Sequence, residues 1–545
     1  MVVQSSLTTK SEVAQSPTKL EETISPKGVC FWLIFLGICL AGFVSSTDAT
    51  IIFVSIPTIT KNLDGQENYI WFGNAYVFAT TAVQPFFGQI SNIFGRRHPM
   101  IFSVALFALG SGITGGANSS AMFIAVRLVQ GVGAGGMIMP IDLIVCDLVP
   151  LPERTTYLGI VLGACAVGTL IRPVIGGAIV SRTSWKWGFW IKLPVCAVTL
   201  AIIVPFLRVS WKKSPAWRHS LARIDYLGNA IFIASITSIL LGLIQGGVNY
   251  PWASWRTILP IALGWIVFVQ QDYCVEPTMP LRPFAHRTSA TVYFLDFMIS
   301  ILLEWCIFVL PLYFQSQLGT SPLKSGIDIL PINEFMIHSA GIAGALLTKT
   351  GKYKPLHSVG FSLLAIATGL FSTMTSTSTK AAWVSFQILA AIGIGFPLTT
   401  QLPAIQAVLP ESDTAISTSI YSFIRSLGFI WGARIPSIIF NSRINATLES
   451  IPDADVRAAF ADEGAYAYAN NVKELSGQPL HQTLNLYANA LRTVWYAGLA
   501  FSLLGLLVVF FFGEACGYEE TLNIEFGLED ISKQKSTTDH DINTA

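Results

Sequence analysis

Two ionisable residues, Asp48 and Arg127, lie inside long apolar stretches of this chain of 545 residues. A charged side chain at the centre of a bilayer costs about 3 kcal/mol or more, so such residues are retained where they pair or perform a function. If each stretch crosses the membrane as a helix, both residues fall in its outer third. We expect them either to pair there or to face a watery cavity. The pair is either structural, or Asp48 gains and loses a proton while Arg127 holds it in one state.

The second half of the chain carries further embedded charges. Glu334 and His338 stand four residues apart, hence on one helix face, where they either satisfy each other or relay a proton. Glu304 has Arg425 at a similar depth, and we expect these two to pair. Five acids and five bases are well embedded, a balance that favours internal pairing. The acids are Asp48, Asp142, Asp296, Glu304 and Glu334, and the bases are Arg127, Arg172, Lys192, Arg425 and Arg434.

Two glycine-pinned basic turns stand half a chain apart. Residues 88–99 read GQISNIFGRRHP and residues 344–355 read GALLTKTGKYKP. In each, two glycines are seven residues apart, cations follow at once and a proline closes the turn. The offset is 344 − 88 = 256 residues, which predicts a duplicated helical bundle of the kind that secondary transporters use. The cations either set topology or bind helix carbonyls and acids.

The composition is that of a membrane protein. Charged residues make up 12% of the chain, against about 25% in soluble domains, and apolar residues make up 52%. A helix needs about 20 apolar residues to cross a bilayer. The sequence offers fourteen such ranges: 30–53, 71–91, 100–117, 122–146, 157–180, 189–207, 226–246, 257–273, 290–313, 326–348, 356–374, 382–404, 414–440 and 491–513.

The distribution of basic residues orients these ranges. With the N-terminus inside, cytosolic segments hold 18 of the 33 Lys and Arg residues and outer loops hold 9. We therefore expect cytosolic termini, and the sequons at Asn118 and Asn445 then lie outside as candidate glycosylation sites. The expected division is a disordered cytosolic tail (1–29), a six-helix half (30–207), a linker with two inserted helices (208–289), a second six-helix half (290–513) with a long outer loop (441–490), and a cytosolic tail (514–545).

The sequence lacks the marks of an enzyme or a nucleic-acid-binding protein. It contains no nucleotide-cradling loop, metal-ligand cluster or nucleophile motif, so we expect no cofactor, no metal and transport driven by a gradient. The net charge of +1 gives no bulk field that would attract nucleic acid. The eight cysteines fall in apolar or expected cytosolic segments, so no disulfide framework is expected.

Short motifs stand in order along nearly the whole chain. They are DATI at 48–51 with Pro57, Trp71 and Tyr76 with QP at 84–85, the turn at 88–97, RLVQGVG at 127–133, Gly159, Gly163 and Gly168 with PVIGG at 173–177, WKW at 185–187, the segment 317–331, and GKY at 351–353. Together they resemble the major facilitator superfamily, specifically its 14-span drug:proton antiporter family as it occurs in fungi.

Four residues depart from the family pattern. Asn92 stands where the basic turn normally carries an acid, and Arg172 stands where the fifth span normally has a glycine. Lys186 and Lys192 stand where the pattern normally has an arginine and an asparagine.

This resemblance implies an all-α membrane protein of the major facilitator fold, with fourteen transmembrane helices as two six-helix halves plus two inserted helices. It implies a monomeric plasma-membrane transporter that exports hydrophobic small molecules, drugs or secondary-metabolite toxins, against proton influx by alternating access. A vacuolar or vesicular membrane is the alternative location. A proton-coupled importer of a siderophore or nutrient, and a receptor that has lost transport, are the alternative functions.

The resemblance also suggests roles for single residues. The glycines of the fifth span let helices approach closely, which serves either packing alone or a seam that tightens and loosens during transport. Proton-coupling candidates are Asp48, Arg127, Glu304, Glu334, His338 and Arg425. Gating candidates are Gly88, Gly95, Arg96, Arg97, Gly163, Gly168, Pro173, Gly176, Gly177, Gly351 and Lys352. Substrate-cavity candidates are Gln130, Arg172 and Asp296.

Overall fold

The structure is a computed structural model, and within the residues that it describes the fold is helical. It describes residues 28–512 apart from 64–68, 183, 209–220, 222, 247–249, 252, 270–278, 411–412 and most of 448–476. A helix lies at each of the fourteen expected ranges. Eleven of these ranges hold one helix each: α1 (Val29–Asn62), α4 (Arg97–Gly115), α5 (Ser120–Leu148), α6 (Leu151–Arg182), α10 (Tyr226–Gln245), α11 (Trp255–Val269), α12 (Arg287–Ser316), α15 (Lys354–Phe371), α16 (Lys380–Gln406), α17 (Thr414–Asn445) and α20 (Gln478–Phe512).

The other three ranges each hold two helices in succession. They are α2 (Tyr69–Ala82) with α3 (Gln84–Phe94), α7 (Trp187–Trp190) with α8 (Lys192–Phe206), and α13 (Pro322–Asp328) with α14 (Leu330–Thr350). A proline stands in the first turn after each break: Pro85, Pro194 and Pro331. Proline lacks an N–H and fixes its φ angle, so it starts a helix more readily than it continues one. These prolines favour the breaks, although Pro140 and Pro311 stand inside continuous helices.

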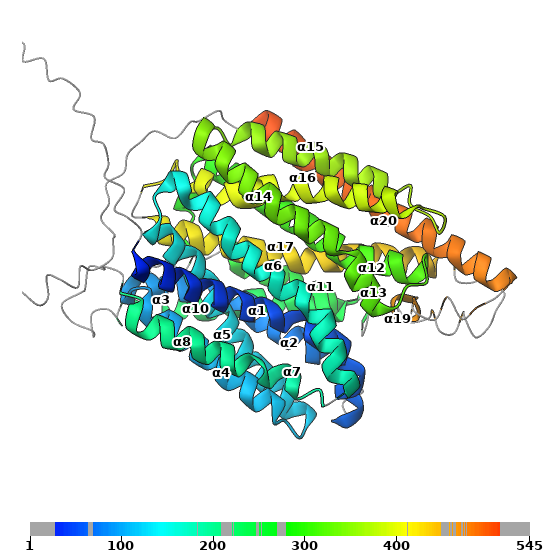
Figure 1. Cartoon of the computed structure of the whole chain (residues 1–545), viewed down its shortest axis with the longest axis horizontal. Helices are drawn as coiled ribbons and strands as arrows, with labels where there is room; N and C mark the ends of the chain where they lie inside the picture. The colour runs from blue at the N-terminus through cyan, green and yellow to red at the C-terminus, as the bar shows by residue number, and fades with distance from the viewer. Residues whose placement is uncertain are drawn as a thin grey trace, which may run out of the picture.

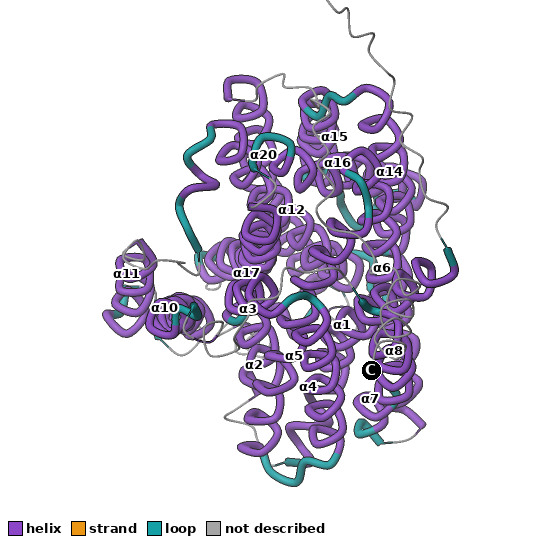
Figure 2. The backbone as a smooth tube through the Cα atoms, turned by 90° about the vertical axis from the view of Figure 1, so that its left-hand side faces the viewer, coloured by secondary structure: helices purple, strands orange, loops and turns teal. Residues whose placement is uncertain are grey.

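The helices gather into two bundles that lie side by side, as Figures 1 and 2 show. One hydrophobic core lies mainly among helices α1 to α10, and includes Phe35, Phe107 and Ile144. A second core lies among α12 to α20, and includes Trp305, Phe361 and Trp495. Helices α3 and α5 of the first bundle pack against α17 of the second, and α6 packs against α14 and α16. The turns at Gly95 and Gly351 lie at the same end of both bundles, which we call the basic-turn end.

Helices α10 and α11 form a hairpin on the outside of the two bundles (Figure 2). Ser238 of α10 donates its hydroxyl to the carbonyl of Pro260 in α11 at 2.8 Å. The hairpin touches both bundles: Asn229 donates to Gln89 of α3 at 2.7 Å, and the rings of Phe232 and Phe423 of α17 lie 5.1 Å apart. The two expected inserted helices therefore flank the contact between α3 and α17.

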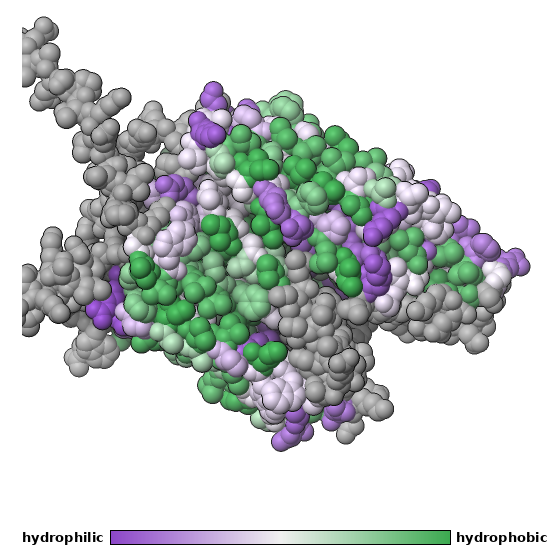
Figure 3. Space-filling view, viewed as in Figure 1, coloured by the Kyte–Doolittle hydropathy of each residue, from purple (hydrophilic) through white to green (hydrophobic). Residues whose placement is uncertain are grey.

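The outer surface of the bundles is largely apolar, as Figure 3 shows over α14, α15 and α8. Leu109, Ile366 and Leu507 are each more than half exposed. Ten of the described helical segments are long and apolar enough to cross a membrane. An apolar belt of this kind needs lipid around it, and the chain is a membrane-spanning protein.

The last expected span and the long loop before it differ from the structure. The final helix was expected over 491–513, but α20 begins at Gln478, and α17 continues to Asn445. The expected loop at 441–490 is therefore shorter at both ends. The first turns of α20 carry polar residues beside the buried Thr483 and Tyr487, and Tyr487 belongs to the second core. An amphipathic start of this kind contains no continuous apolar run, so a search for such runs does not include it in the span.

Candidate functional site

Asp48 of α1 is the centre of a buried ion cluster in the first bundle. Arg127 of α5 donates Nη1 to Oδ2 of Asp48, and Lys192 of α8 donates Nζ to Oδ1. Gln130, one turn after Arg127, donates Nε2 to the same Oδ1 at 2.9 Å and accepts from Arg127 Nη1 at 2.6 Å. Of the two expected arrangements, a pair or a watery cavity, the structure shows the pair of Asp48 and Arg127, and it adds a second cation.

This Asp48 cluster is closed off from solvent. Asp48 and Arg127 are 0% exposed, and Lys192 is 2% exposed. The guanidinium carbon of Arg127 lies 4.4 Å from the ring centroid of Tyr76, and Nζ of Lys192 lies 4.9 Å from that of Phe189. Cation–π contacts contribute about 2 kcal/mol when desolvated. Two cations share one carboxylate, so Asp48 compensates both charges at once.

Lys192 and Gln130 show what sequence reasoning missed in this cluster. Lys192 was counted among the embedded bases but given no partner, because it stands at the edge of an apolar range. The break between α7 and α8 places it at the start of α8, where its long side chain reaches inward. Gln130 was expected to line a substrate cavity, and it lies fully buried, donating also to Ser111 of α4 at 2.7 Å. The available signal was an embedded base, Lys192, with no assigned partner.

A second charge pair joins the two bundles. Arg425 of α17 donates Nη2 to Oδ2 of Asp142 in α5 at 2.7 Å, and Ser422 donates to the same oxygen at 2.9 Å. The expected pairing of Arg425 with Glu304 is therefore wrong. Glu304 lies beside Gly432, seven residues further along α17, where a Cβ atom would meet the Glu304 Cβ at 2.8 Å. Two helical turns separate that level from Arg425, which faces α5 instead.

Further contacts between the bundles cluster toward the basic-turn end. Gln84 of α3 donates to Ser426 of α17 at 2.8 Å, and Arg154 of α6 donates to Gln406 of α16 at 2.6 Å. Gly88 of α3 lies directly on α17, since a Cβ there would meet the Ser419 Cβ at 2.7 Å. These contacts, together with the pair of Asp142 and Arg425, hold the bundles together at this end.

The two basic turns use glycine for their backbone geometry. Gly95 has φ 81° and Gly351 has φ 63°, values that favour glycine. After the first turn, Arg96 donates Nε to Oδ2 of Asp147 at the end of α5, at 2.7 Å, and Arg97 donates to the carbonyl of Val204 in α8 at 2.7 Å. These cations thus bind an acid and a helix carbonyl. After the second turn, Lys352 is exposed.

The glycines of α6 divide into two kinds. A Cβ at Gly168 would meet the carbonyl oxygen of Phe43 in α1 at 2.7 Å, so this glycine allows close helix contact. A Cβ at Gly163 would meet Ile337 of α14 at 3.4 Å, an ordinary contact. The helix at Arg172, Pro173, Gly176 and Gly177 is described, but the surroundings of these four residues lie outside the described part of the structure.

Glu334 and His338 lie on one exposed face of α14. Nδ1 of His338 is 2.8 Å from the backbone carbonyl oxygen of Glu334 and 3.8 Å from its Oε1. The side chains are 58% and 66% exposed. The pair is adjacent, as the spacing predicts, but lies apart from the buried clusters. The sequon residues Asn118 and Asn445 are also exposed, at the end of the bundles opposite the basic turns.

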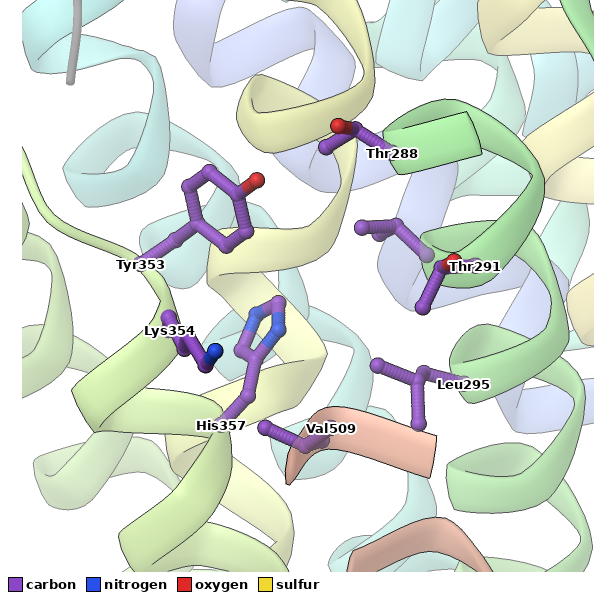
Figure 4. A pocket seen from close by; sticks show the side chains of 8 residues that line it. Thr288, Thr291, Leu295, Tyr353, Lys354, His357 and Val509 are labelled. Carbon is purple, nitrogen blue, oxygen red and sulfur yellow. The ribbon is translucent and has the colours of Figure 1, made fainter. Parts of the chain in front are cut away.

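Asp296 of α12 is a buried carboxyl group. It is 0% exposed, and among the described residues neither of its oxygens has a hydrogen-bond partner. The adjacent Leu295 lines a small pocket, where Figure 4 shows Thr291 and Leu295 opposite His357 of α15. His357 Nε2 lies 2.9 Å from Thr400 Oγ1. The pocket offers space for about one water molecule, far less than an organic cargo needs.

The chain resembles known transporters in sequence and in fold. Its residues 38–433 match the family model described as Major Facilitator Superfamily. It is 44% identical to the "MFS efflux transporter aclA" of Aspergillus oryzae, over 98% of both chains, and 40% identical to the "Efflux pump FUS6" of Gibberella fujikuroi, over 93% of both. Among solved structures it resembles the proton:xylose symporter XylE, with a TM-score of 0.56 at 14% identity, covering 92% of this chain and 98% of that one. The chain belongs to the major facilitator superfamily of membrane transporters.

Proposed function

We propose that this protein is an efflux pump that exports hydrophobic small molecules from the cell in exchange for protons. The observation that carries the proposal is the 44% identity, over nearly the full length of both chains, to a protein named an efflux transporter. Other similar proteins also carry efflux names, such as "MFS-type efflux pump LUC4" of a Fusarium species, at 39% identity. Drugs or secondary-metabolite toxins are the proposed cargo.

In this proposal all fourteen helical ranges cross the plasma membrane, with both termini in the cytosol. The basic-turn end then faces the cytosol. The proposed division is into halves at 30–207 and 290–513, joined by the linker 208–289, and the two hydrophobic cores, which lie mainly in one half each, support it. Each half moves as one body, and the protein acts as a monomer.

The contacts between the bundles support alternating access as the mechanism. Among the described residues they concentrate near the basic-turn end, which supports a conformation that is closed to the cytosol. Opening to the cytosol requires separating Arg425 from Asp142 and Arg154 from Gln406. Arg96, after the first basic turn, and Asp147, at the end of α5, both lie within the first bundle. Their ion pair can therefore persist while the bundles rock. Gly88 lets α3 approach α17 closely enough for that motion to be a switch between two packed states, and Gly168 lets α6 pack closely on α1 within the first bundle.

Buried carboxyl groups support coupling to protons. A carboxyl group in the membrane interior gains or loses a proton according to the charges beside it. Asp48, with Arg127 and Lys192, is one such site, and Arg425 is the base between the bundles. Glu304, Glu334 and His338 are further candidates. The candidates for the cargo path are Gln130, Arg172 and Asp296. Of these, Gln130 takes part in the Asp48 cluster instead.

The function is tested by finding the cargo and then driving its transport. Metabolites are compared between cells and medium in a host with and without the gene, and the compound that depends on the gene is the probe. Inverted membrane vesicles with an acidic interior should accumulate it, and a protonophore should abolish the accumulation. Accumulation that needs ATP, or that ignores the pH gradient, would contradict proton-coupled efflux.

A further inference from the structure

Asp296 differs sharply from Asp48 in its surroundings, although both carboxyl groups are fully buried. The oxygens of Asp48 receive Arg127, Lys192 and Gln130. Those of Asp296 receive no hydrogen bond among the described residues. An ionised carboxylate buried without partners costs several kcal/mol, whereas the protonated form costs far less. The Asp48 site therefore stabilises a carboxylate, and the Asp296 site stabilises a neutral carboxyl group.

The packing of α12 on α17 places Asp296 beside the charge pair that joins the bundles. Tyr293 of α12 donates its hydroxyl to the carbonyl of Ser417 at 3.2 Å, and Ser300 lies against Gly428. The two helices run in the same direction, so Asp296, one turn after Tyr293, lies at the level between Tyr421 and Arg425. Arg425 and Asp142 are the charged groups whose fields act on Asp296.

Among the described residues, two further charged groups lie near this level: Asp413, whose field reaches Tyr293, and Lys354, which lines the small pocket beside Leu295. The ionisable neighbours of Asp296 are Tyr421 and Arg425 on α17, and Tyr293 on α12 itself. Helix α16 brings Gln401, which is also 0% exposed and whose side-chain amide has no partner among the described residues. Helix α15 contributes His357, which contacts Thr400. The guanidinium of Arg425 is thus the base available to two carboxyl groups, those of Asp142 and Asp296. In this conformation it bonds to Asp142.

We propose that Asp296 is the proton-carrying carboxyl group of the second bundle, and that Arg425 exchanges Asp142 for Asp296 when the basic-turn end opens. The proposal rests on the proton-coupled function proposed above. While the bundles are closed, Asp296 keeps its proton because Arg425 is held by Asp142. Opening carries Asp142 away with α5. Arg425 stays with Asp296 in the second bundle, the Asp296 O–H bond breaks, and the proton leaves to the water that enters between the bundles. The carboxylate then pairs with the guanidinium.

Infrared spectroscopy of the purified full-length protein tests whether Asp296 carries a proton. It needs no cargo, because the probe is the proton itself. A protonated carboxyl group has its own carbonyl stretching band, which disappears on ionisation. At neutral pH the wild-type protein should show this band and Asp296→Asn should lack it. Asp48→Asn serves as the control and should retain it. A band of equal size in Asp296→Asn would overturn the proposal, as would its absence from the wild type.

A second variant tests the exchange. Asp142→Asn removes the partner that holds Arg425 in the closed state, so the guanidinium turns to Asp296 and ionises it. The infrared band should therefore be lost in Asp142→Asn although Asp296 is intact, and Glu304→Gln should leave it unchanged. An undiminished band in Asp142→Asn would refute the exchange. Asp296→Asn keeps a neutral group of the same shape, so its melting temperature should match that of the wild type, and a large drop would also count against the proposal.

These outcomes are separate from those of the efflux test. If vesicles carrying the wild-type protein ignore the pH gradient, the proposed function fails whatever the infrared band does. If they respond to it and Asp296→Asn still accumulates the cargo against its gradient, proton coupling stands and the role of Asp296 falls.

Discussion

Arg425 and Asp142 form a buried ion pair, 2.7 Å between Nη2 and Oδ2, that joins the two bundles near the end where the basic turns lie. The two side chains are 10% and 8% exposed. Removing one partner of a buried pair costs about 3–5 kcal/mol, because the other charge is left without compensation. The pair therefore stabilises the closed state of this interface relative to the open state.

Replacing Arg425 with methionine should open the interface. Cys146 reports on this directly, since it is buried and Nε2 of Gln406, across the interface, lies 3.3 Å from its Sγ. Arg425→Met should raise the rate at which N-ethylmaleimide alkylates Cys146, by about tenfold for each 1.4 kcal/mol lost from the closed state. Peptide mass spectrometry of the purified protein measures the rate.

The matched control is Arg434→Met, on the same helix. Arg434 donates to the carbonyl of Leu243 in α10, away from Cys146. Its replacement should leave the alkylation of Cys146 near the wild-type rate. Equal rates in both variants and the wild type would show that Arg425 does not hold the interface closed.

The Asp48 cluster predicts strongly coupled substitutions. Asp48→Asn leaves Arg127 and Lys192 buried as like charges, and should cost about 3–5 kcal/mol of stability. Lys192→Met leaves one acid and one base, and should cost much less. The double variant should be more stable than Asp48→Asn alone, because it removes the excess cation. Thermal unfolding in detergent measures all three, and additive losses would contradict the shared carboxylate.

The sequence predicted the helices well because their signals are local. Runs of apolar residues marked all fourteen helical ranges, and Pro85, Pro194 and Pro331 mark the breaks within three of them. The start of α20 was missed because Thr483 and Tyr487 are buried by tertiary packing rather than by a continuous apolar run.

The partners of buried charges were harder to predict, because they depend on helix rotation. Depth along the helices suggested Glu304 for Arg425, but depth does not say which face a residue occupies. Arg425 faces α5, and Asp142 is its partner. For Asp48 and Arg127 the same argument from depth gave the right partner, but it missed Lys192 and Gln130. Among the described residues Asp296 has no hydrogen-bond partner, and this could not be read from sequence, since it is a property of the whole packed interior.

Orientation in the membrane is open to a direct test at Asn118 and Asn445. Both side chains are exposed at the end opposite the basic turns, and the proposed topology places that end outside. Expression in a fungal host should attach glycans, so endoglycosidase treatment should increase electrophoretic mobility. The shift should shrink in Asn118→Gln or Asn445→Gln and vanish in the double variant. A full shift in the double variant would mean that glycans lie elsewhere, and glycosylation of a sequon placed at the basic-turn end would reverse the orientation.

Gly163 and Gly168 of α6 form a matched pair for testing the close contact between helices. A Cβ at Gly168 would meet the backbone carbonyl oxygen of Phe43 at 2.7 Å, and backbone cannot move aside easily. Gly168→Ala should therefore force α1 and α6 apart and cost about 1–3 kcal/mol. A Cβ at Gly163 would lie 3.4 Å from a methyl group of Ile337, an ordinary contact. Gly163→Ala should leave stability within about 0.5 kcal/mol of the wild type or raise it, since alanine favours the helix. Melting temperatures in one detergent compare the two, and equal effects would mean that α1 and α6 are not held together by the small residue at position 168.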